Sequence, residues 1–173
     1  MERWVLLLRG VNVGGRNRVP MDRLRGVLTD LGYDDVDTYI QSGNVAFDAP
    51  SRPDPGHLSA LLGRELGCLV PAVVLARSEL VEVLERNPFG SLETDPKLLH
   101  VLFFSHEPDA DDVARLDHRR YAPDRFEITG RAAYVHFPNG SARSKLTIDV
   151  FERGLDVTAT GRNLRTALRL VGL

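Results

Sequence analysis

The sequence predicts an α+β fold built from two tandem ferredoxin-like (βαββαβ) halves, followed by an extra C-terminal helix. The main observation is the order of the hydrophobic patterns, because strand-like and helix-like segments follow one another as β-α-β-β-α-β in residues 1–77 and again in residues 78–173. A second observation is an internal echo: Ile40–Val45 and Ile128–Ala133 are similar turns, and each follows a β-α-β block. The two halves are therefore expected to meet near residue 78.

The first half begins with the apolar run Trp4–Leu8, which is typical of a central strand that is buried on both faces. A helix is expected to open at Pro20 and to end at Gly32, because apolar residues recur between them at helical spacing (Met21, Leu24, Leu28, Leu31). The remaining elements are a half-buried strand at 36–40, a hairpin partner at 45–47, a helix at 58–66 that Gly67 ends, and a strand at 71–76.

The second half opens with a linking helix that Ser78 caps and Asn87-Pro88 ends. Its further predicted elements are a strand at 98–104, a helix at 109–117, paired strands at 125–128 and 131–137, a helix near 144–153 that Gly154 ends, and a short strand at 156–159. Thr160 is expected to cap the C-terminal helix, with Leu164, Leu168 and Val171 on one face.

Composition and charge indicate an ordinary globular protein. The chain has 173 residues, of which 43% are hydrophobic and 27% charged, and its net charge of −2 excludes a strongly basic nucleic-acid coat protein. Cys68 is the only cysteine, so no internal disulfide forms, and it is expected to be a packed residue. The run Trp4–Leu8 is too short for a secretory signal or a membrane span, which favours a cytoplasmic location without a membrane partner.

The segment Arg9–Arg18 carries the strongest functional signal, because it is a long polar connection and nothing in it is expected to fill a core. It holds three glycines, two asparagines and three arginines, where roughly 2–6 residues would connect a strand to a helix. In a split βαβ unit this loop and the hairpin tip 41–44 lie at the same sheet edge. The predicted ligand-binding residues at that edge are Arg9, Asn12, Gly14, Gly15, Arg16, Gln41, Ser42 and Asn44.

Such an edge offers backbone N–H groups and positive charge, so the predicted ligand is anionic and contains phosphate, as a nucleotide or nucleic acid does. Lys145, Arg162 and Asn163 are added as candidate contacts because each is expected near a helix start. Gly and Asn also make ordinary turns, so each of these residues has a purely structural interpretation as well. A nucleotide P-loop is rejected, since Arg16-Asn17 stands where Lys-Ser/Thr is needed.

Other chemistry finds little support in the pattern. The five histidines show no metal-ligand spacing, so no metal and no cofactor are predicted. Ser144 and Lys145 are neighbours and do not face each other on a helix, and no carboxylate pair suits acid–base catalysis. Two alternatives therefore stay open beside ligand binding: an enzyme that acts on a small anionic substrate at the same site, and a protein-interaction scaffold whose polar edge is turn chemistry.

Several motifs resemble one bacterial family. These are Arg9–Met21 (RGVNVGGRNRVPM), Tyr39–Val45 (YIQSGNV), Asn87-Pro88-Phe89, Ser144–Thr147 and Thr160-x-Arg162-Asn163. On these residues the whole chain is similar to domain-of-unknown-function family 1697, an uncharacterised group of conserved proteins. The resemblance implies an α+β fold and brings no established activity. Leu164 follows the Arg-Asn pair where the family usually has Trp, which weakens a stacking role at that position.

Overall fold

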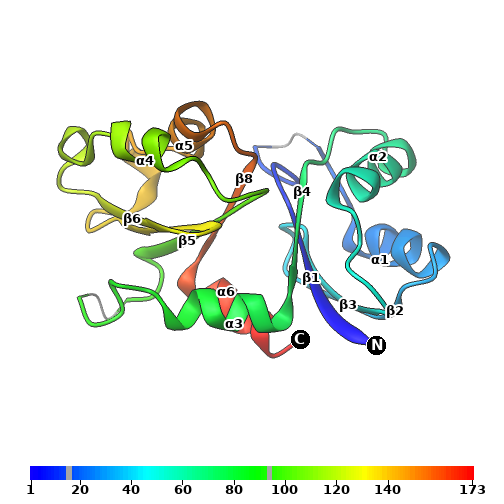
Figure 1. Ribbon diagram of the computed structural model, residues 1–173. Coiled ribbons are helices and arrows are strands. Elements are labelled where there is room, and N and C mark those ends of the chain that lie inside the picture. Colours follow the sequence, from blue (N-terminus) through cyan, green and yellow to red (C-terminus); the bar gives the residue numbers. More distant parts are fainter. Residues whose placement is uncertain (15–16, 93–94) are drawn as a thin grey trace. The chain divides into compact units, whose positions relative to one another are not determined.

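The computed structural model describes residues 1–14, 17–92 and 95–173. It confirms the α+β fold, with two four-stranded antiparallel sheets and helices between the strands of each. The described chain divides into two units, which we call unit 1 (Met1–Val81 with Leu170–Leu173) and unit 2 (Glu82–Arg169). Figure 1 shows the elements of both units.

Unit 1 has the sheet order β2-β3-β1-β4, which is the ferredoxin-like arrangement. Its elements are β1 (Glu2–Leu8), α1 (Met21–Asp30), β2 (Asp34–Tyr39), β3 (Asn44–Ala49), α2 (Pro55–Leu66) and β4 (Ala72–Ala76). Strand β1 is buried from Trp4 to Leu8, as its continuous apolar run predicts. Apolar residues of α1 and α2 form one core with every second residue of β1, so both helices cover the same face of the sheet (Figure 1).

Local sequence signals account for the ends of these elements. Asp54 caps α2 by accepting a hydrogen bond from the His57 N–H, and Pro55 occupies the first turn. Gly67 ends the same helix with a left-handed φ of 71°, a conformation that costs glycine little. Cys68 is half-buried against the core of unit 1, in line with its expected packing role.

Unit 2 repeats the arrangement, with the sheet order β6-β7-β5-β8. After the linking helix α3 (Arg77–Glu85), its elements are β5 (Leu99–Phe104), α4 (Ala110–Arg115), β6 (Arg125–Thr129), β7 (Ala132–His136), α5 (Ile148–Leu155) and β8 (Ala159–Asn163). Short 3₁₀ turns lie at His118–Tyr121 and Ser141–Arg143, and α6 (Leu164–Val171) is the extra C-terminal helix. A separate core joins α5 to the sheet through Phe151, Phe104 and Phe126.

The two units form equivalent hydrogen bonds at the ends of their first strands. In unit 1 the Leu8 N–H donates to Gly43 O (2.9 Å), and in unit 2 the Phe104 N–H donates to Arg131 O (2.9 Å). Each hairpin tip is therefore tied to the end of the strand beside it. The echo between Ile40–Val45 and Ile128–Ala133 thus corresponds to two equivalent hairpins.

Two of the expected elements are wrong in their bounds. Residues 160–163 belong to strand β8 and not to a helix start, because Thr160 pairs with Phe103 and Arg162 with Val101. Helix α6 begins at Leu164, and Leu168 is 53% exposed instead of packed. The helix expected near 144–153 begins at Ile148 and continues through Gly154 to Leu155, so Lys145 lies before it. Among the described residues, no helix is long and apolar enough to cross a lipid bilayer.

Candidate functional site

The loop after β1 and the β2–β3 hairpin tip lie against each other in unit 1, as the topology predicts. Besides the bond from Leu8 to Gly43, the Asn12 side-chain amide donates to Gln41 O at 2.9 Å. A Cβ on Gly43 would lie 2.6 Å from Val11 Cγ2, so only a glycine lets the two segments come this close. We call these two segments, residues 9–14 with 17–19 and residues 40–43, the loop–hairpin edge.

The loop is anchored in the core of unit 1, contrary to expectation. Val11 and Val19 are both buried and belong to the same core as the helices. Sequence reasoning missed this because two valines in a polar loop form no periodic pattern. The residues between and around these anchors are mostly exposed, among them Gly10, Val13, Gly14 and Arg18.

Asn12 holds the loop in shape. Its Nδ2 donates to Val19 O and to Gln41 O (2.9 Å each), and its Oδ1 accepts from the Val19 N–H at 2.8 Å. Asn17 adds a bond from its Nδ2 to Gly10 O at 3.2 Å. Both asparagines have left-handed backbones, with φ of 55° and 47°, which this residue type tolerates better than most. The side chain of Asn12 therefore has a structural role, whatever the loop binds.

Asn44 has a similar role under the hairpin tip. Its side chain is fully buried, and its Nδ2 donates to Tyr39 O at 3.1 Å and to Ser42 Oγ at 2.7 Å. It closes the turn from inside, which leaves Gln41 exposed at the surface and Ser42 half-buried. Arg9, at the end of β1, is also half-buried. Two further predicted residues, Gly15 and Arg16, lie outside the described residues.

Positive φ recurs at every second residue of the loop. Gly10, Asn12 and Gly14 have φ of 69°, 55° and 57°, whereas Val11 and Val13 between them do not have positive φ. Where right-handed residues alternate with left-handed ones, successive N–H groups point to one side, which is the geometry of an anion-binding nest. The Asn12 N–H donates to Asn17 O at 3.0 Å. Val13 takes part in a β-bridge, and the Gly14 N–H donates to no residue within the described ranges.

The other predicted residues belong to unit 2. Arg162 lies in β8, where its guanidinium donates to Thr160 Oγ1 and to Gly161 O (2.8 Å each). Burial lowers the pKa of Arg162 to about 10, because a charged group loses hydration there. Asn163 caps α6 through its Oδ1, which accepts from the Thr166 N–H at 2.8 Å. Both side chains thus take part in the folding of unit 2.

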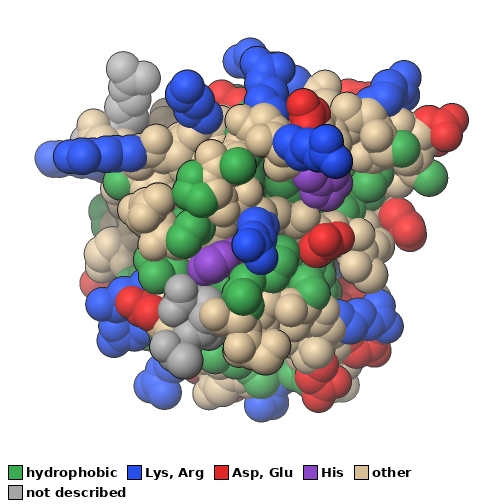
Figure 2. Space-filling model, turned by 90° about the vertical axis from the view of Figure 1, so that its left-hand side faces the viewer, with side chains coloured by type: hydrophobic (Ala, Val, Ile, Leu, Met, Phe, Trp, Pro, Cys, Tyr) green, Lys and Arg blue, Asp and Glu red, His purple; other side chains and the backbone are tan. Residues whose placement is uncertain are grey.

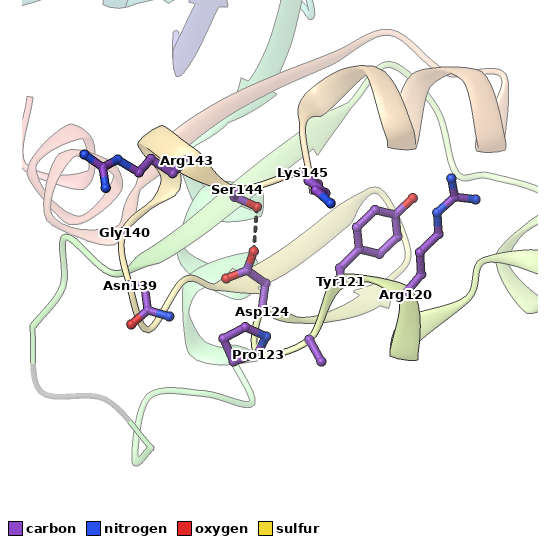
Figure 3. A pocket seen from close by; sticks show the side chains of 10 residues that line it. Arg120, Tyr121, Pro123, Asp124, Asn139, Gly140, Arg143, Ser144 and Lys145 are labelled. Carbon is purple, nitrogen blue, oxygen red and sulfur yellow. Dashed lines mark hydrogen bonds between the residues drawn. The ribbon is translucent and has the colours of Figure 1, made fainter.

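Lys145 lines a cavity of about 410 Å³ that is open at the surface of unit 2, which sequence reasoning did not foresee. The cavity lies between the segments Arg120–Asp124 and Asn139–Lys145, and Figure 3 shows the side chains around it. Its lining includes Arg120 and Arg143 besides Lys145. Neither segment carries a periodic pattern, and nothing in the sequence indicates that the two meet.

The fold and these features define a protein with two tandem ferredoxin-like units, in which hydrogen bonds and buried valines hold a polar loop at a sheet edge of unit 1. Residues 1–134 match the family described as "Protein of unknown function (DUF1697)", and the chain belongs to that family, as its motifs predict. No curated protein matches the chain. Among solved structures it is similar to the conserved bacterial protein SP0830 from Streptococcus pneumoniae, with 26% identity and a TM-score of 0.70 over 99% of this chain and 97% of that chain.

Proposed function

We propose that this protein binds a phosphate-containing ligand, such as a nucleotide, at the loop–hairpin edge of unit 1. The observation that carries the proposal is the backbone of residues 10–14, where positive φ recurs at every second residue and the Gly14 N–H has no acceptor among the described residues. A phosphate group has several acceptor oxygens, which suits a set of converging N–H donors.

The connection between β1 and α1 is longer than the fold alone requires. Unit 1 joins β1 to α1 through residues 9–20, whereas unit 2 joins β5 to α4 through residues 105–109. Both connections start from equivalent positions, since the Arg9 N–H donates to Pro71 O and the Ser105 N–H donates to Thr158 O. Unit 2 thus connects the equivalent strand and helix with a much shorter segment.

Charge adds support from the same loop. Arg18 is exposed and Arg9 is half-buried at the end of β1, so two guanidinium groups come from the two ends of the connection. A guanidinium can donate two parallel hydrogen bonds to a phosphate, which makes arginine well suited to this ligand. Asn12 and Asn44 contribute by fixing the loop before the ligand arrives, and preorganisation of this kind lowers the entropic cost of binding.

The test is a titration of the full chain with ADP and with inorganic phosphate, followed through the backbone amide NMR signals of Val13 and Gly14. We expect these signals to shift on binding. Arg18→Gln should weaken binding about tenfold or more, because it removes a charge-assisted hydrogen bond. Arg64→Gln is the matched control, since Arg64 is exposed on α2 in the same unit and its loss changes the net charge equally.

A second pair of variants tests the backbone. Gly14 has open space around it, so a side chain there meets only the cost of its left-handed φ. Gly14→Val should weaken binding about fivefold or more, whereas Gly14→Asn should bind nearly as the natural chain does. Unmoved amide signals at about 1 mM ligand would overturn the proposal, as would equal effects of Arg18→Gln and Arg64→Gln.

A further inference from the structure

The cavity of unit 2 is lined by residues from two irregular segments that follow different strands. Asp124 and Tyr121 belong to the turn before β6, whereas Ser144 and Lys145 follow the turn after β7. In Figure 3, Lys145 and Tyr121 point into the space between the two segments, with Arg120 beyond Tyr121 and Arg143 at the opposite end. The volume of the cavity, about 410 Å³, falls within the range of about 300–1,000 Å³ that is typical of small-molecule sites.

The cavity carries an excess of positive charge. Arg120, Arg143 and Lys145 all line it, and none of their side chains forms an ion pair or hydrogen bond with any residue in the described part of the chain. Three cations beside a single carboxylate, that of Asp124, therefore favour an anionic ligand.

Asp124 is held in a fixed position with part of its hydrogen-bonding capacity left over. Ser144 Oγ donates to Asp124 Oδ2 at 2.5 Å and itself accepts from the Leu146 N–H at 2.9 Å (Figure 3). No described residue donates to the other oxygen, Oδ1. A carboxylate oriented in this way can accept from a hydroxyl or amino group of a ligand, which a bare anion does not have.

Tyr121 supplies an aromatic surface at the same cavity. Its ring is half-buried and rests edge-on against Phe126, with ring centroids 6.4 Å apart. Aromatic side chains stack against bases and sugars, and such contacts are tolerant of the base's identity. Inorganic phosphate would use the cations and leave both Tyr121 and Asp124 without a role.

We propose that this cavity is a second ligand site, separate from the loop–hairpin edge, which binds a nucleoside monophosphate. Lys145 contacts the phosphate, Tyr121 contacts the ring system, and Asp124 accepts from a ribose hydroxyl. Arg120 and Arg143, at the two ends of the cavity, add positive charge. On the face shown in Figure 2, Lys and Arg side chains are separated by other residues and mixed with acidic ones. This favours a compact ligand over a long nucleic acid, which would follow a continuous basic surface.

The test is a calorimetric titration of the full chain with AMP, GMP, CMP, UMP and inorganic phosphate, with NMR amide signals of Asp124 and Lys145 reporting the location. We expect at least one nucleotide to bind more tightly than phosphate and to move these signals. Lys145→Gln should weaken that nucleotide about tenfold or more, because an ammonium that bonds a phosphate is lost. The matched control Arg165→Gln, an exposed residue of α6, should leave the affinity within twofold.

Asp124→Asn separates a nucleotide site from a simple anion site. Loss of the negative charge should strengthen binding of inorganic phosphate about threefold, whereas binding of the nucleotide should weaken because the amide is a poorer acceptor for the ribose hydroxyl. The proposal is overturned if no nucleotide binds at about 1 mM, if nucleotides and phosphate bind equally, or if Lys145→Gln and Arg165→Gln behave alike. Because Arg18→Gln and Gly14→Val affect only the edge in unit 1, failure of either proposal is seen independently of the other.

Discussion

Replacing Gly43 by alanine tests how closely the hairpin tip of unit 1 is fitted against the loop that follows β1. Gly43 has a φ of 70°, and an alanine in this left-handed region costs about 1–2 kcal/mol. A Cβ there would also lie 2.6 Å from Val11 Cγ2 and 2.7 Å from Leu8 Cβ. Relief of such overpacking costs about 1–3 kcal/mol more. We therefore expect Gly43→Ala to lower the free energy of unfolding by about 2–5 kcal/mol.

Gly10→Ala is the matched control for this substitution. Gly10 has nearly the same φ, 69°, but a Cβ on it would meet no atom within 4 Å, so it should lose only about 1–2 kcal/mol. Urea unfolding followed by fluorescence measures both, because Trp4 is the only tryptophan and is buried in the core of unit 1. Equal losses for the two variants would show that Val11 and Leu8 move aside easily, which would refute the close fit.

Three other predictions concern single side chains. Asn12→Ala removes three hydrogen bonds and should lower the free energy of unfolding by about 2–4 kcal/mol. Asn17→Ala removes one hydrogen bond and should lower it by about 0.5–1.5 kcal/mol. Equal losses in the two variants, measured by Trp4 fluorescence, would contradict this. Tyr134→Phe should cost about 1–2 kcal/mol in urea unfolding followed by circular dichroism, because the buried hydroxyl donates to Val83 O at 2.7 Å; an unchanged midpoint would count against that bond. Burial lowers the pKa of His100, so the unfolded chain binds a proton at this residue more readily than the folded chain does. The free energy of unfolding should therefore fall as the pH drops below about 6.5. His100→Gln should reduce this pH dependence, and an unchanged slope would exclude His100 as its source.

The sequence was informative about the fold wherever a signal is local. The apolar run of β1, the glycine at the end of α2 and the two hairpins each follow from a few adjacent residues. The strand expected at 156–159 lies instead at Ala159–Asn163 (β8), because the evidence for its position is not local. Gly161 is a poor strand former, yet it pairs with Leu102, and a Cβ on it would touch Ile148 as well. Residues distant in the chain thus determine its conformation.

The contact between the loop after β1 and the hairpin tip was predictable from the sequence, whereas the roles of the individual side chains were not. The ferredoxin-like topology alone brings the end of β1 beside the hairpin tip, and the bond from Asn12 to Gln41 O agrees with it. A sequence cannot distinguish an asparagine that contacts a ligand from one that supports a loop, because both are polar residues in a turn. The contacts of Asn12 and Asn44 give these two side chains a supporting role, which leaves the backbone and the arginines as the proposed ligand contacts.

The two units provide an internal comparison that bears on both proposals. They share the sheet order and the bonds that tie each hairpin tip to the neighbouring strand, so these features are what the fold itself needs. They differ in the connection after the first strand, which is long and glycine-rich in unit 1 and short in unit 2. Conversely, the cationic cavity belongs to turns of unit 2, around Asp124 and Lys145. Features that appear in only one unit are not required by the shared fold. In both units they include hydrogen-bond donors and positive charge, which is the chemistry that we propose binds phosphate.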